Sequence, residues 1–172
     1  MFLLLTVGCA SLLTIEISES TQLTIEQGTV LETVLADFGF GDFVSMDLTE
    51  SEELVNQGVE PGDIELVTLT VLELEVIEPN SADLSFFEKM TFFASAADVD
   101  TVEIASAPAF PEGESLVVFD LEDVDLTPYV VSETMTLETD VTARRPDQDT
   151  LIEARFTIEV QATIQGAKNQ LD

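Results

Sequence analysis

The chain is dominated by alternation of apolar and polar residues, and residues 150–164 show it most clearly. The even-numbered positions from Ile152 to Ile164 are all apolar, whereas the odd-numbered positions from Glu153 to Thr163 are polar. This period of two predicts a half-buried antiparallel strand with one solvated face. Since an ordinary strand has about 5 to 6 residues, we expect a bend or bulge within this segment.

Residues 64–77 alternate as well, but the apolar positions change phase halfway along. They are Val67, Leu69 and Val71 in the first half, and Leu72, Leu74 and Val76 in the second. A one-residue bulge between Val71 and Leu72 keeps both halves directed toward the core. Strands that change sheet at such a bulge form corners in sandwiches, so this segment is a candidate corner.

Further short alternating segments predict strands at 12–17, 23–26, 91–95, 101–105, 116–119 and 133–143. Residues 144–149 read Arg-Arg-Pro-Asp-Gln-Asp, which predicts the turn between the last two strands, because Pro-Asp favours turns and Pro cannot continue a central strand.

One short helix interrupts the strands. Residues 49–52 read Thr-Glu-Ser-Glu, a capping-box pattern, and Gly58 offers a C-terminal stop, so we predict a helix from Glu50 to Gln57 with Leu54 and Val55 packing inward. A second helical turn is expected at 125–130. The pattern as a whole predicts an all-β fold, an antiparallel β-sandwich of the Ig-like or jelly-roll-like kind with one short helix near residues 50–57.

Charge narrows the range of partners. The 172 residues include 35 acidic and 5 basic side chains, a formal charge of −30, and the first cation is Lys89. Nucleic-acid binding relies on cations that neutralise phosphates, so we exclude it, together with electrostatic docking on anionic lipid. Such a field attracts a basic partner or metal cations; alternatively, the carboxylates only solvate the chain, as in a high-salt habitat.

The missing residue types exclude several chemistries. The chain has no His, no Trp and a single Cys. It therefore has no Ser-His-Asp triad, none of the usual zinc sites and no internal disulfide. Catalysis is left to carboxylates, hydroxyls, Tyr129 and a few cations, and no carboxylate pair is singled out as a glycosidase pair. We predict that the protein is not an enzyme.

The N-terminal residues 1–10 read Met-Phe-Leu-Leu-Leu-Thr-Val-Gly-Cys-Ala, an apolar run that ends in a small residue and then Cys9. This resembles the lipobox of bacterial lipoproteins, in which the cysteine becomes the lipidated first residue. The resemblance implies that residues 1–8 are a truncated signal segment and that residues 9–172 form one domain. Because no segment approaches the ~20 apolar residues of a membrane helix, we expect membrane attachment only through a lipid on Cys9. The alternative is a buried cysteine in an N-terminal strand.

The order of blocks over residues 38–165 carries a second resemblance. The blocks are 38–43 (Phe-Gly-Phe-Gly-Asp-Phe), the capped helix with 55–59, the long Thr/Leu-rich strand, 83–87 (Asp-Leu-Ser-Phe-Phe), 124–129 and the final hairpin. This order resembles that of uncharacterised bacterial envelope lipoproteins with a single β-sandwich domain. It implies a location in the bacterial cell envelope, anchored on the periplasmic or outer surface, or secretion. It implies no activity and no site residue.

Two acidic clusters are candidate calcium ligands, since Ca²⁺ takes six to eight oxygen ligands, largely from loops. The candidate residues are Asp98, Asp100, Asp120, Glu122, Asp123 and Asp125. The alternative is that these residues are solvated loop carboxylates, and no other cofactor is expected.

Aromatic and cationic residues supply the remaining candidates. Phe38, Phe40 and Phe43 either plug one end of the sandwich or form an exposed loop that grips a partner. The second phenylalanine group comprises Phe86, Phe87, Phe92 and Phe93, and it is expected in the core or, alternatively, around an apolar ligand cavity. Arg144 and Arg145 either pair with nearby carboxylates or act as an anion hook.

Together these observations predict a non-catalytic, lipid-anchored or secreted envelope β-sandwich, an accessory or adhesion-type module that contacts an envelope protein or a basic partner. The alternative is a carrier of a small apolar ligand, or a Ca²⁺-binding module.

Overall fold

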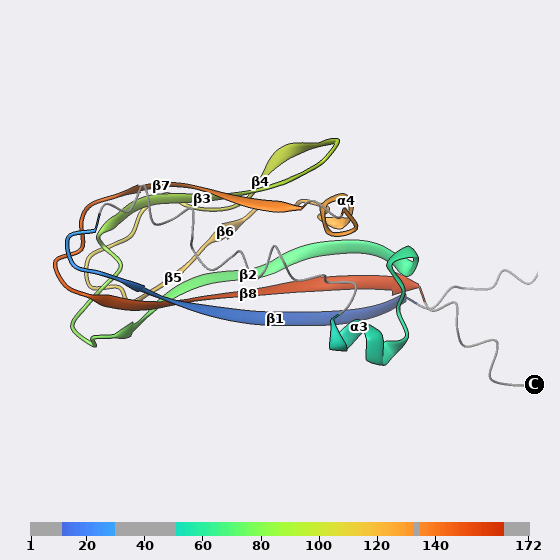
Figure 1. Cartoon of the computed structure of the whole chain (residues 1–172), viewed down its shortest axis with the longest axis horizontal. Coiled ribbons are helices and arrows are strands. Elements are labelled where there is room, and N and C mark those ends of the chain that lie inside the picture. Colours follow the sequence, from blue (N-terminus) through green and yellow to red (C-terminus); the bar gives the residue numbers. More distant parts are fainter. Residues whose placement is uncertain (1–11, 30–50, 133–134, 164–172) are drawn as a thin grey trace, which may run out of the picture.

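The computed structural model describes residues 12–29, 51–132 and 135–163 of the chain, and these residues form two antiparallel sheets packed face to face (Figure 1). Sheet A has the strand order β1-β8-β2-β5, with β1 at Leu12–Ile25, β8 at Thr150–Thr163, β2 at Ile64–Glu78 and β5 at Leu116–Val118. Sheet B has the order β6-β4-β3-β7, with β6 at Asp120–Leu121, β4 at Val99–Ala107, β3 at Phe87–Ala96 and β7 at Thr136–Ala143. The all-β sandwich predicted from the sequence is confirmed.

Strand β8 follows its sequence pattern throughout its described length. Every even-numbered residue from Thr150 to Ala162 is buried between the sheets, and the odd-numbered residues are half-buried on the outer face. The expectation of a bulge in this strand is wrong, because β8 pairs with β1 in unbroken register over all fourteen residues. The irregularities lie in its other neighbour, β2, where the register shifts between Ile64 and Leu66, between Leu69 and Val71, and between Val76 and Glu78.

The phase change in β2 coincides with one of these shifts. Leu69 pairs with Ile158 and Val71 with Thr157, so Thr70 is the extra residue, one position before the expected bulge. The bulge returns the apolar side chains to the core, with Val67 buried before it and Leu72 after it. Strand β2 nevertheless remains in sheet A over its whole length and does not form the expected corner.

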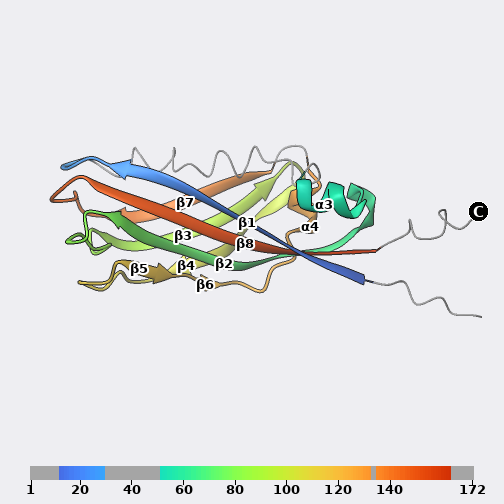
Figure 2. The same ribbon diagram turned by 90° about the horizontal axis from the view of Figure 1, so that it is seen from below.

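The corner is formed by β5 and β6, which follow each other along one long side of the sandwich (Figure 2). Strand β5 pairs with β2, the buried Phe119 donates its backbone N–H to the carbonyl of Leu72 at 3.0 Å, and β6 then pairs with β4. The segment thus changes sheet within one residue and joins the two layers.

Two short helices and a 3₁₀ turn lie at one end of the sandwich (Figure 1). Helix α3 spans Glu52–Gln57, with Ser51 as its N-cap and Gly58 as a left-handed C-cap at φ 66°. The expected packing is half right, since Leu54 is buried but Val55 is exposed. Residues 49 and 50 lie outside the described residues, and the observed cap is Ser51, not Thr49. The 3₁₀ turn η3 covers Pro61–Asp63.

Helix α4, at Thr127–Val130, is the predicted second helical turn and ties the sheets together. The Thr127 hydroxyl accepts the backbone N–H of Val67 from sheet A at 2.9 Å, and the Tyr129 hydroxyl donates to the carbonyl of Asp100 in sheet B at 2.7 Å.

The core is filled by phenylalanine rings that pack on one another. Phe87 lies 4.4 Å from Phe86 and 5.3 Å from Phe110, and Phe119 lies 5.3 Å from Phe92, measured between ring centroids. The core assignment is confirmed for Phe86, Phe87 and Phe92. Phe93 is only half-buried, because it pairs with the exposed Glu138 and so shares the outer face of sheet B.

Candidate functional site

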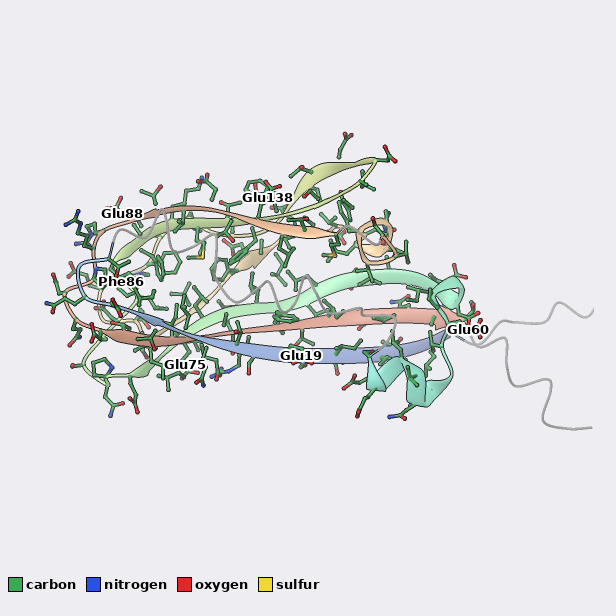
Figure 3. All side chains as sticks on the ribbon, in the orientation of Figure 1. Glu19, Glu60, Glu75, Phe86, Glu88 and Glu138 are labelled. Atoms are coloured by element: carbon green, nitrogen blue, oxygen red, sulfur yellow. The ribbon has the colours of Figure 1, made fainter. Side chains whose placement is uncertain are left out.

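The outer face of sheet A carries an ordered polar patch that extends across all four strands. Residues directly opposite each other in antiparallel strands lie on the same face, so the register fixes two neighbouring rows. The first row consists of Ser20, Arg155, Glu73 and Val118, and the second consists of Gln22, Glu153, Glu75 and Leu116. We call these eight residues the two-row patch. Glu75 is labelled in Figure 3, on the lower side of the sandwich away from Phe86.

Arg155 is the centre of this patch. Its Nη1 lies 2.7 Å from Oε1 of Glu73, its Nε donates to Oε1 of Glu153 at 2.5 Å, and its Nη2 donates to Oε2 of Glu75. The planar guanidinium presents its donors in a fixed fork, so one arginine can hold carboxylates from two strands at once. The network therefore fixes three acidic side chains in place across β2 and β8.

Hydrogen bonds shift two of these pKa values. The pKa of Glu153 is lowered, mainly because the Gln22 side-chain amide donates to its Oε2 at 2.8 Å, and secondarily because Arg155 bonds its other oxygen. The pKa of Arg155 is raised by its bonds to Glu75, Glu153 and Glu73, in that order of importance. The formal charges of the three carboxylates and the one guanidinium sum to −2.

Two apolar side chains border the network. Leu116 and Val118 lie on β5, one of the two edge strands of sheet A among the described residues, and the two residues are 43% and 63% exposed. Beyond the network, Glu16 of β1 lies directly opposite Glu159 of β8, so the acidic character continues along the same face. The face can thus present ordered negative charge beside an apolar margin to another molecule.

The predicted calcium ligands lie on β4, on β6 and in the segments next to them. Asp98 forms the tight turn between β3 and β4 at φ 62°, and Asp100 lies on β4. Asp120 lies on β6, and Glu122, Asp123 and Asp125 follow this strand. Asp125 accepts the backbone N–H of Thr127 at 2.9 Å and so helps to start α4. All six side chains are exposed, and in the part of the chain that the structure describes no three acidic side chains gather in a way that suits a metal ion.

The other predicted sites divide between described and undescribed residues. Cys9 and the loop phenylalanines Phe38, Phe40 and Phe43 lie outside the described residues. Arg144 lies in the predicted turn after β7, where its side chain donates to the carbonyl of Ser85 at 2.5 Å and lies 3.6 Å from Glu88 of β3. The contact with Glu88 is of the kind expected under the first of the two alternatives, pairing with a nearby carboxylate.

Sequence reasoning missed the Arg155 network. The alternation places Arg155 and Glu153 on the outer face of one strand, and Glu73 and Glu75 on the outer face of another. The network depends on the register between these strands, and three bulges in β2 set that register. The available signal was a single cation on the polar face of a long strand in a very acidic chain.

No protein-family model, curated protein or solved structure matches the chain. The candidate site is therefore argued from the structure alone. Within the described residues, no helix has both the length and the apolar character needed to cross a membrane.

Proposed function

We propose that this protein is a non-catalytic β-sandwich module of the bacterial cell envelope, anchored through a lipid on Cys9 or secreted. Its role is to contact a positively charged envelope protein through the two-row patch. The observation that carries the proposal is the position of exposed Leu116 and Val118 beside three carboxylates that Arg155 already holds in place.

The physical basis is preorganisation. Ordering long side chains on binding costs roughly 0.5 to 1.5 kcal/mol each, and here intramolecular bonds have already ordered four of them. The exposed apolar margin adds hydrophobic contact at about 25 cal/mol per Å² of buried apolar surface. Protein interfaces combine apolar contact with complementary charge, and this face offers both, with the apolar residues on the edge strand beside the charged network.

Complementary charge favours a basic partner. Two acidic side chains directly opposite each other, such as Glu16 and Glu159, repel and lower the stability of the free sheet. A cationic partner relieves that repulsion and is also drawn by the net charge of −30. No described feature favours the apolar carrier, because the core phenylalanines pack on one another.

A site-specific photo-crosslinking experiment in the native host tests the contact. The crosslinking residue replaces Val118 in one strain and Glu138, which is exposed on the outer face of sheet B, in another. The proposal predicts a discrete crosslinked protein of basic charge from position 118 and no such product from position 138. Equal products from both positions, or none from either, contradict it.

The anchor requires a separate test. Growth with a clickable palmitate analogue should label the unmodified chain and should not label Cys9→Ser. Unlabelled chain in the membrane fraction contradicts lipid anchoring, and release of the unlabelled chain to the medium supports the secreted form.

A further inference from the structure

The β2–β3 connection and the β7–β8 turn lie at the end of the sandwich opposite helix α3 (Figure 1). Residues of these two segments line a hollow of about 250 Å³. Its charged lining residues are Asp83, Arg144, Arg145 and Asp147, and its neutral polar residues include Ser81, Ser85 and Gln148. Two of the five basic residues of this very acidic chain therefore line one small space. None of the residues that line this hollow belongs to the two-row patch.

The carboxylate on its wall is already satisfied internally. Oδ1 of Asp83 accepts the backbone N–H of Ser85 at 3.0 Å and its hydroxyl at 2.6 Å, and Oδ2 accepts the backbone N–H of Gly113 at 2.7 Å. These three bonds lower the pKa of Asp83, chiefly through the Ser85 hydroxyl. Asp83 therefore links the β2–β3 connection to the loop that contains Gly113, and both of its carboxylate oxygens face these donors.

Hydrogen bonds hold Arg144 in position beside Asp83. Its backbone N–H donates to the carbonyl of Phe86 at 2.6 Å, and its Nη2 donates to the carbonyl of Ser85 at 2.5 Å. Its Nε also lies 3.6 Å from Oε1 of Glu88, and because a guanidinium carries five N–H donors, these two side-chain contacts leave donors in excess. Arg144 is a preorganised cation on the wall.

Arg145, the next residue, is exposed, and no ion pair to it occurs among the described residues. Pro146, which follows, is buried and fixes the direction of the turn. The Gln148 amide and the Ser81 hydroxyl can both donate hydrogen bonds. The lining thus combines two guanidinium groups and neutral donors with two carboxylates, Asp83, whose oxygens already accept three hydrogen bonds, and the exposed Asp147.

We infer that this hollow is an oxyanion-binding site that takes the carboxylate or phosphate group of a small molecule, with Arg145 as the main contact and Arg144 as the fixed second cation. Arginine suits both groups because its fork matches two oxygens of either one. The exposed Asp147 on the rim opposes the anion and limits its affinity.

Isothermal titration of the full chain, carrying Cys9→Ser to prevent lipid attachment, tests the inference. The probes are inorganic phosphate and succinate at matched ionic strength, so that the two sources of the oxyanion are told apart. We expect saturable binding of at least one probe, about tenfold weaker in Arg145→Gln, because this variant loses the charge-assisted hydrogen bonds of the guanidinium. Asp147→Asn should bind a few-fold tighter.

The matched control is Lys89→Gln, which removes an exposed cation of β3 that does not line the hollow. Its affinity for the probe should equal that of the unmodified chain. Absence of saturable binding to both probes overturns the inference. Affinity that is unchanged in Arg145→Gln, or that falls equally in Lys89→Gln, also overturns it. Thermal melting of each variant separates loss of binding from loss of fold.

Discussion

The two faces of strand β8 lie on the same fourteen residues but are built on different principles. The inner face begins with the buried Thr150 and continues with apolar side chains from Ile152 to Ala162. All of these side chains are buried between the sheets. The outer face holds Arg155, Thr157 and acidic residues, and its order comes from bonds to the strands on either side. Burial therefore specifies the fold on one face, whereas electrostatics arranges a contact surface on the other.

The largest predicted effect lies on the inner face. Phe156→Ala should lower the free energy of unfolding by about 3 to 5 kcal/mol, because the side chain is buried and its loss leaves a cavity. Urea titration followed by circular dichroism measures the change. The control is the adjacent Thr157→Ala on the outer face, for which about 1 kcal/mol or less is expected, the net contribution of its single hydrogen bond to Ser18. Similar losses of stability in both variants would contradict the proposed difference between the inner and outer faces of β8.

Arg155→Gln should cost less, roughly 1 kcal/mol, even though it removes three ion pairs. The guanidinium is 38% exposed, so water and salt weaken each pair, and much of the loss comes from the three carboxylates left facing one another. Repulsion among exposed charges is screened by salt, so the difference from the unmodified chain should shrink between 0.05 and about 1 M NaCl. A difference that stays constant or grows with salt is inconsistent with this account.

Glu153→Gln should cost about 0.5 kcal/mol at neutral pH, and this difference should depend on pH. The folded-state pKa of Glu153 is lowered, so its contribution is present above the unfolded pKa and is lost as the pH falls through the folded-state value. Unfolding curves of both chains should therefore converge below the ordinary glutamate pKa of about 4.3. Curves of Glu153→Gln that diverge on acidification contradict the assigned pKa shift.

The smallest effect on stability is expected at the apolar margin. Leu116→Thr with Val118→Thr should change the free energy of unfolding by about 0.5 kcal/mol or less, because both side chains are exposed and Thr is at home in strands. The same double variant should lose the crosslinked partner from a probe placed at Thr157, at the border of the patch. Unchanged crosslinking in a folded double variant removes the margin from the interface.

The sequence predicted the inner face well and the outer face poorly, and the physics differs between them. Alternation in residues 150–164 identified which side chains of β8 are buried, because hydrophobic burial depends on each residue in turn. The phase change near Thr70 located the bulge to within one residue. The contacts of Arg155 depend instead on which residues of β2 lie opposite it. A local sequence pattern does not specify how two distant segments pair.

Two further differences have the same origin. Residues 12–17 and 23–26 were predicted as separate strands, because the stretch between them is polar on both faces, yet pairing with β8 carries β1 continuously from Leu12 to Ile25. The corner was expected in β2, where the phase changes, but β5 and β6 form it. Backbone pairing with a neighbour overrides a weak local signal.

A titration with a short cationic peptide of alternating lysine and valine tests the central claim most directly. Backbone amide shifts of the full chain carrying Cys9→Ser are recorded by NMR in about 0.15 M NaCl, where the Debye length is about 8 Å and nonspecific attraction to distant carboxylates is screened. The account predicts changes concentrated at the two rows of sheet A and reduced in Leu116→Thr with Val118→Thr. Changes spread evenly over the outer faces of both sheets would show that the acidic surface attracts cations without a defined site, and would contradict the claim.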